Sequence, residues 1–198
     1  MKHTVVYLHG LNSSGLSFKY VQSKLPAHNV VNVNYQSHQP LAQSIVEVLN
    51  QIPKNTLISV VGHSLGGLIA TLIAPKFPGH IKNLITISAP LGGSKAANVV
   101  RWLPGHPQVM ADIATSSGFI NQLRDQKEPV YPVLNIVSTG GHLNSSSEPN
   151  DSVVTIASQC ALPFGSKEQV FANHFEVLMH DDTIRLIKDQ RSNLQGLT

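Results

Sequence analysis

The chain has 198 residues, of which 41% are hydrophobic and 13% are charged, and its formal net charge is +3. This length suits one domain with a single buried core. The positive balance reflects few acidic residues rather than many basic ones, and no Lys/Arg run interleaves with aromatic residues, so nucleic-acid binding is a poor interpretation.

Several other classes of protein are also disfavoured. No apolar run approaches the roughly 18–20 residues of a membrane span, so no transmembrane segment is expected. The N-terminus leads straight into a strand-like run without the regions of a signal peptide, which favours a cytoplasmic protein. The ten histidines are scattered without metal-binding spacing, so we expect neither a metal nor another cofactor. The sequence leaves the oligomeric state open.

Along the chain, apolar runs of strand length alternate with segments of helical period. The expected strands are Thr4–Leu8, Asn29–Tyr35, Thr56–Val61, Ile81–Ser88, one within Val130–Ser138, and Gln169–Ala172. The expected helices are Ser17–Leu25, Leu41–Gln51, Leu65–Lys76 and Thr183–Arg191, the last preceded by Asp181 and Asp182 as capping residues. This alternation predicts an α/β fold, a three-layer α/β/α sandwich with a mainly parallel sheet of about six strands.

Two segments interrupt the alternation. Leu91–Pro129 is an insertion with apolar residues on a background of loops and short helices. Because it leaves the sheet at the edge where ligands bind, we favour a small cap over the site, with a peripheral helical excursion as the alternative. Thr139–Asn150 has the composition of a polar, flexible loop. No second domain is evident, so residues 1–198 are expected to form one domain.

The strongest chemical signal is a serine between two glycines, directly behind the apolar strand Thr56–Val61. These residues read Gly62-His63-Ser64-Leu65-Gly66 and lead into an expected helix. A serine hydroxyl is a weak nucleophile at neutral pH and needs a base beside it. A sharp strand-to-helix turn presents the hydroxyl at the sheet edge, and crowding in that turn requires glycines two residues before and after it. Ser64 is therefore the candidate nucleophile.

In folds with this turn, the acid and then the base follow the serine along the chain. Two histidines follow the last predicted strand. His174 lies at its carboxyl end, where ligands bind in parallel sheets, whereas His180 lies beside an expected helix start, so His174 is preferred as the base. Asp151 is preferred as the acid because an apolar segment follows it and could anchor it, with Glu148 as the alternative.

Acyl transfer also needs two preorganised donors for the oxyanion. The N–H of Leu65, the residue after the nucleophile, is one candidate. The other is expected in the loop after the first strand, where Gly10 permits a close backbone approach and Leu11 supplies the N–H. His9 precedes the serine in the chain, so we expect it to pin this loop by a hydrogen bond rather than to act in catalysis.

With these residues placed, the chain resembles the α/β-hydrolase superfamily, in particular its lipase and esterase members. His9-Gly10 resembles the lipase oxyanion motif, and Gly62–Gly67 matches the nucleophile turn. Ser88-Ala89-Pro90-Leu91-Gly92-Gly93-Ser94 is similar to the T-P-x-x-G-S segment of those enzymes. Asp151–Val154 resembles their acid segment, and Asn173–Leu178 their terminal histidine segment. These matches run from residue 9 to about residue 180.

The resemblance implies a serine hydrolase that cleaves carboxylic esters through a Ser-His-Asp triad and an acyl-enzyme intermediate. A small-molecule acyl ester is the implied substrate, and Leu11, Leu91, Trp102 and Met110 are the residues expected to contact its acyl group. A thioesterase or acyltransferase with the same triad is the alternative, since fold and triad do not separate these activities. A non-catalytic binding module on a hydrolase fold is a further alternative.

The chain also departs from the family pattern. The insertion is short for a lipase lid. The chain begins at what would be the third strand of the family, so a reduced sheet is expected. The missing secretion signal argues against a secreted, fat-digesting lipase.

Overall fold

A computed structural model describes residues 3–102, 104–142 and 147–192. Six strands form one sheet in the order β2-β1-β3-β4-β5-β6, and every neighbouring pair is parallel. The strands are β1 (His3–Leu8), β2 (Val30–Val33), β3 (Leu57–His63), β4 (Ile81–Ile87), β5 (Val133–Ser138) and β6 (Ser166–Val170). The predicted α/β class with a parallel sheet is confirmed, and the sheet is wholly parallel.

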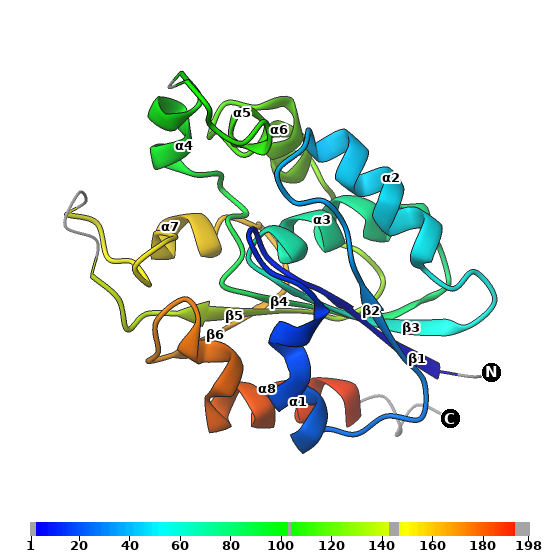
Figure 1. Cartoon of the computed structure of the whole chain (residues 1–198). Helices are drawn as coiled ribbons and strands as arrows, with labels where there is room; N and C mark the ends of the chain where they lie inside the picture. The colour runs from blue at the N-terminus through cyan, green and yellow to red at the C-terminus, as the bar shows by residue number, and fades with distance from the viewer. Residues whose placement is uncertain (1–2, 103, 143–146, 193–198) are drawn as a thin grey trace.

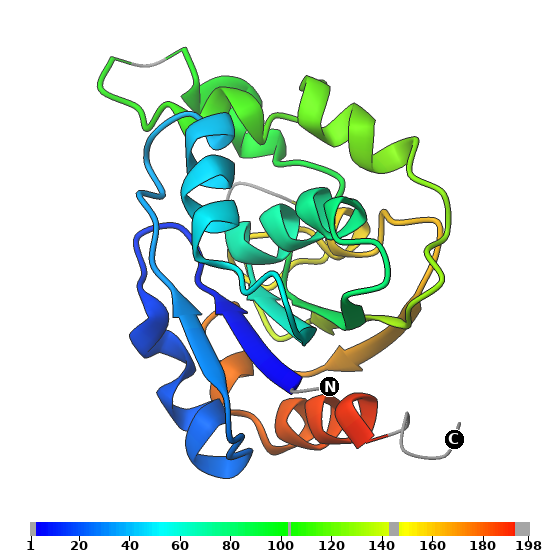
Figure 2. The ribbon, with the colours of Figure 1, turned by 90° about the vertical axis from the view of Figure 1, so that its right-hand side faces the viewer.

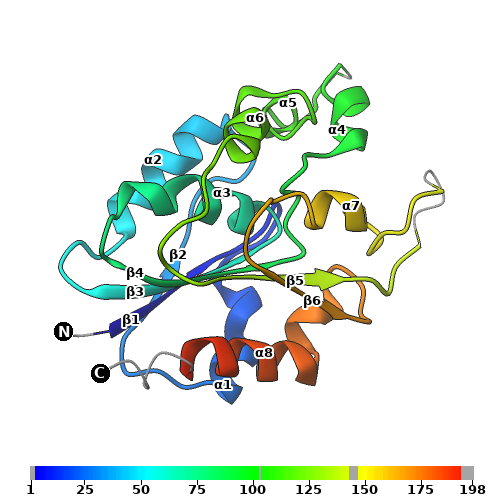
Figure 3. The ribbon, with the colours of Figure 1, turned by 180° about the vertical axis from the view of Figure 1, so that it is seen from behind.

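Helices cover both faces of this sheet (Figure 1). One face carries α2 (Leu41–Gln51), α3 (Leu65–Ile73), α4 (Lys95–Val100), α5 (Val109–Asp112), α6 (Gly118–Arg124) and α7 (Ile156–Gln159). The other carries α1 (Lys19–Lys24) and α8 (Asp181–Ser192), which the view from behind shows beneath the strands (Figure 3). Three short 3₁₀ helices complete the described elements: η1 (Gly15–Phe18), η2 (Ala74–Lys76) and η3 (Glu176–Met179).

Strand β3 lies inside the sheet, and every residue from Ile58 to His63 is buried. A strand with helices on both sides must be apolar on both faces. This explains why the residues of Ile58–Val61 are apolar except for Ser59. Because the strands are parallel, all their carboxyl ends meet at one edge, which we call the carboxyl edge. Ser64 follows β3 there, and the segments that follow β1, β4 and β5 begin at the same edge.

Several predicted boundaries were wrong. The sixth strand is Ser166–Val170 rather than Gln169–Ala172. The helix expected over Leu65–Lys76 ends at Ile73 and continues as η2, because Pro75 lacks the N–H that an α-helix needs. Helix α8 begins at Asp181, so its two aspartates occupy the first turn rather than precede it. The strand expected over Asn29–Tyr35 covers only Val30–Val33. Of the predicted loop 139–150, residues 143–146 lie outside the described part of the chain.

Candidate active site

Ser64 occupies a strained turn between β3 and α3. Its φ is 54° and its ψ is −123°, a conformation that costs a non-glycine residue about 1–3 kcal/mol. The flanking glycines make the turn possible: a Cβ on Gly62 would lie 2.5 Å from the carbonyl oxygen of Gly66, and one on Gly66 would lie 2.2 Å from that of Leu8. The predicted crowding is present, and the turn presents the serine hydroxyl at the carboxyl edge of the sheet.

Three predicted residues meet in one chain of hydrogen bonds. The Nε2 atom of His174 lies 2.9 Å from Ser64 Oγ, and its Nδ1 atom lies 2.7 Å from Oδ2 of Asp151. The backbone N–H of His174 also donates to the carbonyl oxygen of Asp151, at 2.8 Å. Both His174 and Asp151 are buried. The imidazole is therefore fixed at both nitrogens, with one facing the hydroxyl and the other the carboxylate.

The two alternative residues lie in other contacts. His180 lies just before α8, where its Nδ1 atom accepts the N–H of Asp182 at 3.2 Å. Glu148 forms an ion pair with Lys95. Neither His180 nor Glu148 lines the cavity beside Ser64. The structure therefore brings His174 and Asp151, and not these alternatives, to the serine.

Sequence reasoning missed two side chains that hold the acid. Ser138 Oγ donates to Asp151 Oδ2 at 2.5 Å, and Gln159 Nε2 donates to the same oxygen at 3.2 Å. Burial by itself would raise the pKa of Asp151, but the hydrogen bond and charge of His174, the Ser138 hydroxyl and the Val154 N–H together lower it. The only available signal was the position of Ser138 at the end of a parallel strand.

His63 is a further residue that the sequence analysis left without a role. Its Nε2 atom lies 2.8 Å from the carbonyl oxygen of His174, so this nitrogen carries the proton and donates. Burial first, and the neighbouring His174 second, lower the pKa of His63 to about 3. His63 is thus a neutral donor that ties the end of β3 to the segment bearing His174.

The loop after β1 approaches the serine closely. A Cβ on Gly10 would lie 3.0 Å from Ser64 Cβ, so a larger residue would displace one of the two. His9 anchors this loop as predicted: its Nδ1 atom lies 2.8 Å from the carbonyl oxygen of Gly10, and its ring stacks on Tyr35. Within the described residues, the N–H groups of Leu11 and Leu65 have no protein acceptor. Both are therefore available to an anion.

A cavity of about 750 Å³ opens beside Ser64. Insertion 91–129 supplies one wall through α4 and α5, and η3 supplies part of another. The side chains that line it are mostly apolar and include Leu11, Val100, Val109, Met110, Ile113 and Leu178. Its size and lining suit an organic ligand with a substantial apolar part.

Two predicted contact residues do not line this cavity. Leu91, in the segment that follows β4, is 1% exposed and packs in the core. Trp102 is 77% exposed just beyond α4, with the guanidinium of Arg101 over its ring. Of the insertion residues expected to contact an acyl group, Met110 alone lines the cavity. The cause is that an apolar residue in an irregular segment can face the core, the site or solvent.

The part of the chain that the structure describes lacks two further features. No group of three or more His, Cys, Asp or Glu side chains is arranged there to hold a metal ion. In the same part of the chain, no helix has the length and apolar character that crossing a membrane requires.

The parallel sheet, the serine at a strained strand–helix turn and the order serine, aspartate, histidine along the chain are typical of the α/β-hydrolase class. A family model described as alpha/beta hydrolase fold matches residues 3–125, and the chain belongs to this family.

Curated relatives are pimeloyl-[acyl-carrier protein] methyl ester esterases. The enzyme of Shewanella oneidensis is 34% identical over an alignment of 92 residues, and the match covers 43% of this chain and 34% of the relative. That of Vibrio vulnificus strain YJ016 is 31% identical over an alignment of 130 residues, and the match covers 61% of this chain and 47% of the relative. The matches therefore span about a third to a half of the length of these relatives.

Solved structures share the fold at low sequence identity. The mature form of the Bacillus licheniformis lipase BlEst2 superimposes with a TM-score of 0.75 and 16% identity, over 93% of this chain and 90% of that one. The product of gene lin2722 from Listeria innocua has a TM-score of 0.71 and 15% identity, over 98% and 96% of the two chains. These likenesses concern the fold.

Proposed function

We propose that this protein is a carboxylic ester hydrolase in which Ser64 is the nucleophile, His174 the general base and Asp151 the acid. The observation that carries the proposal is the hydrogen-bonded chain from Ser64 Oγ through both nitrogens of His174 to Asp151, at 2.9 and 2.7 Å. The methyl ester esterases among the relatives support the same reaction class.

In the first half-reaction, Ser64 Oγ attacks the ester carbonyl carbon while its proton passes to His174 Nε2. The carbonyl oxygen becomes negative and accepts hydrogen bonds from the N–H groups of Leu11 and Leu65, each worth about 3–4 kcal/mol in such sites. The carbon–oxygen bond to the alcohol then breaks, and His174 gives its proton to the departing alcohol. The acyl group is left on Ser64.

In the second half-reaction, a water molecule loses a proton to His174 and attacks the acyl carbon. The bond to Ser64 breaks, His174 returns the proton to Oγ, and the carboxylic acid departs. Asp151 stabilises the imidazolium in both halves, and its lowered pKa keeps it ionised for this task. The neutral His63 adds no positive charge beside that imidazolium.

The proposed substrate is a small ester with an apolar portion, because the cavity beside Ser64 is lined mostly by apolar side chains. The same machinery can transfer an acyl group from a thioester or to an alcohol other than water. Matched oxygen esters and thioesters of one acid, assayed with and without an added alcohol, distinguish these activities. We also propose that segment 91–129 acts as a small cap. The cytoplasmic location stays a prediction.

Replacing Ser64 with alanine tests the proposal. Turnover of p-nitrophenyl esters is expected to fall by about 10⁴-fold or more, because the nucleophile is lost while the binding groups remain. Labelling by a fluorophosphonate probe should disappear in the same variant. Retained turnover or labelling would contradict the proposed role of Ser64.

Ser13→Ala is the matched control, because Ser13 lines the same cavity but is exposed and belongs to no catalytic contact. Its turnover and labelling should match those of the unaltered protein. Failure of the unaltered protein to react with the probe would favour a binding module on a hydrolase fold.

A further inference from the structure

A second hollow lies far from the candidate active site. It has a volume of about 340 Å³, and the residues around it include His3, Lys24, Lys82, Lys188 and Arg191. They come from the start of β1, the end of α1, the start of β4 and the last turns of α8. We call it the basic hollow. It lies at the amino end of the strands, whereas Ser64 follows a carboxyl end.

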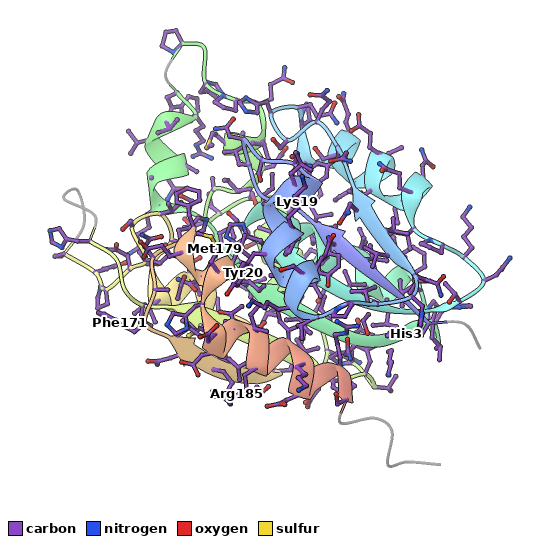
Figure 4. All side chains as sticks on the ribbon, turned by 60° about the horizontal axis from the view of Figure 1, so that its bottom comes forward. His3, Lys19, Tyr20, Phe171, Met179 and Arg185 are labelled. Atoms are coloured by element: carbon purple, nitrogen blue, oxygen red, sulfur yellow. The ribbon has the colours of Figure 1, made fainter. Side chains whose placement is uncertain are left out.

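The figures show this separation. Met179, which lines the cavity beside Ser64, and His3, which lines the basic hollow, lie well apart in Figure 4. Figure 2 shows the start of β1 close to the carboxyl end of α8. The basic hollow is therefore a separate feature of the molecule, formed by segments distant in sequence.

Positive charge in the basic hollow is not balanced by acid. Four of the 14 Lys and Arg residues of the chain line it, and this exceeds the formal net charge of +3 for the whole protein. Among the described residues, no Asp or Glu lines the hollow. Ion pairs do form elsewhere among the described residues. Their cations are Lys95, Arg185, His174 and His180, and none of these lines the hollow.

The lowered pKa of His3 is consistent with a positive electrostatic potential in the basic hollow. Burial lowers the pKa of His3 most, and the charges of Lys82 and Arg191 lower it further. Its Nε2 atom also contacts Ser59 Oγ at 2.8 Å, which holds the ring at the start of β1. His3 is thus kept from adding a fifth positive charge to the four that are fixed.

Helix capping explains part of this arrangement. Lys82 Nζ donates to the carbonyl oxygen of Arg191 at 3.3 Å, and Arg191 Nη1 donates to that of Leu25 at 3.4 Å. A helix carboxyl end carries about half a negative charge, so the ends of α1 and α8 together balance about one of the four cations. About three positive charges remain. Lys24 Nζ lies over the Tyr20 ring, 5.4 Å from its centroid, and within the described residues neither Lys24 nor Lys188 donates a hydrogen bond to a protein acceptor.

We propose that the basic hollow binds a small phosphate-bearing anion. A phosphate monoester carries about −1.5 to −2 at neutral pH and three acceptor oxygens, so it offsets most of the surplus, whereas one carboxylate offsets a third of it. The free N–H groups of Arg191 and the ammonium groups of Lys24 and Lys188 are the donors for it. Leu25 and Pro26 provide an apolar wall for the organic part of the ligand.

Calorimetric titration of the full chain with glycerol 3-phosphate and with pyrophosphate, at constant ionic strength, tests this proposal. Saturable binding of at least one is expected. The double variant Lys24→Gln/Lys188→Gln should bind about tenfold more weakly or worse, since two charged donors are lost. A phospholipid head group has the same chemistry, so sedimentation with phosphatidylcholine vesicles, with and without phosphatidic acid, forms the second arm.

The matched control is Lys54→Gln/Lys127→Gln, which removes the same charge from two exposed lysines elsewhere. It should bind like the unaltered protein, and ester turnover should be unchanged in both double variants, whose melting temperatures verify folding. Binding in solution supports a soluble ligand, and binding only to vesicles with phosphatidic acid supports a lipid. Equal affinity of the two double variants, or no saturable binding in either arm, would overturn the proposal.

Discussion

Asp151 accepts five hydrogen bonds. Its Oδ1 atom accepts the N–H groups of Val153 and Val154, and its Oδ2 atom accepts from Ser138, Gln159 and His174. The Ser138 hydroxyl donates its one proton to the carboxylate. Ser88 Oγ lies 2.6 Å from Ser138 Oγ and is therefore the donor in the hydrogen bond between the two serines. These donors favour the ionised form of the carboxylate and hold its orientation.

His63 makes the stability of the protein depend on pH. Its folded pKa is about 3 and its ordinary value is 6.5, so between these values the unfolded chain binds a proton that the folded one excludes. Unfolding is therefore favoured as the pH falls below about 6.5. At pH 4.5 the free energy of unfolding is therefore lower than at pH 7.5 by about 1.4 × (6.5 − 4.5), roughly 3 kcal/mol.

Replacing His63 with glutamine should remove that part of the pH dependence, because an amide does not titrate and still has an N–H for the His174 carbonyl. Urea unfolding at pH 7.5 and pH 4.5 measures the change in free energy of unfolding. The variant should lose about 3 kcal/mol less than the unaltered protein between these pH values.

His28→Gln serves as the control, since His28 is exposed. It should retain the full pH dependence of the unaltered protein. An unchanged pH dependence in His63→Gln would show that His63 does not stay neutral in the folded state.

Some residues of the candidate site could be predicted from the sequence, and others could not. Ser64, Asp151 and His174 could be selected because a turn motif and a fixed chain order restrict the choice. His63 and Ser138 have no such pattern, since an imidazole before the nucleophile or a hydroxyl at a strand end has many uses. Their contacts with His174 and Asp151 depend on side-chain geometry that only the folded chain provides.

At the scale of elements, helices α4 and α5 decide how much space lies beside Ser64. Val100 ends α4, and Val109 and Met110 begin α5, and all three line the cavity. Burial of one methylene contributes about 0.8 kcal/mol. If two methylenes of an acyl chain are excluded from this wall, kcat/KM for that ester should change by about tenfold. The insertion is therefore the expected determinant of acyl chain length.

Met110→Trp should narrow the cavity and shift the substrate preference of the protein toward short esters. The ratio of kcat/KM for p-nitrophenyl decanoate to that for the butyrate should fall by about tenfold or more. Val46→Trp, on the exposed side of α2, adds the same bulk elsewhere and should leave the ratio unchanged. Equal ratios in the two variants would mean that the acyl chain does not lie against α5.

Strand β6 shows why one element was placed wrongly. Its residues Ser166–Gln169 are exposed, and only Val170 is buried, so the strand has no apolar alternation to detect. It pairs with β5 alone, at the edge of the sheet. Backbone pairing, rather than burial, fixes its register, and such pairing leaves little mark on the amino-acid sequence. The interior strands, buried on both faces, were found from their apolar runs.

At the scale of the whole molecule, the sheet separates two apolar clusters and its strands belong to both. In β1, Val6 and Leu8 face the cluster of α2 and α3, whereas Val5 and Tyr7 face the cluster that includes Ile187 of α8. Alternate side chains of one strand thus connect the two layers. We expect the layers to unfold together as one cooperative unit.

Ile187→Ala tests that expectation from the side opposite α3. Ile187 is fully buried, so its truncation should cost about 2–5 kcal/mol of unfolding free energy. Val46→Ala, on the exposed side of α2, should cost less than about 0.5 kcal/mol. In urea, ester turnover and far-ultraviolet circular dichroism should be lost together at a lower midpoint, with kcat unchanged below the transition. Turnover that disappears well before the helical signal would show that the layer bearing the insertion unfolds alone, and the prediction of one domain would then be wrong.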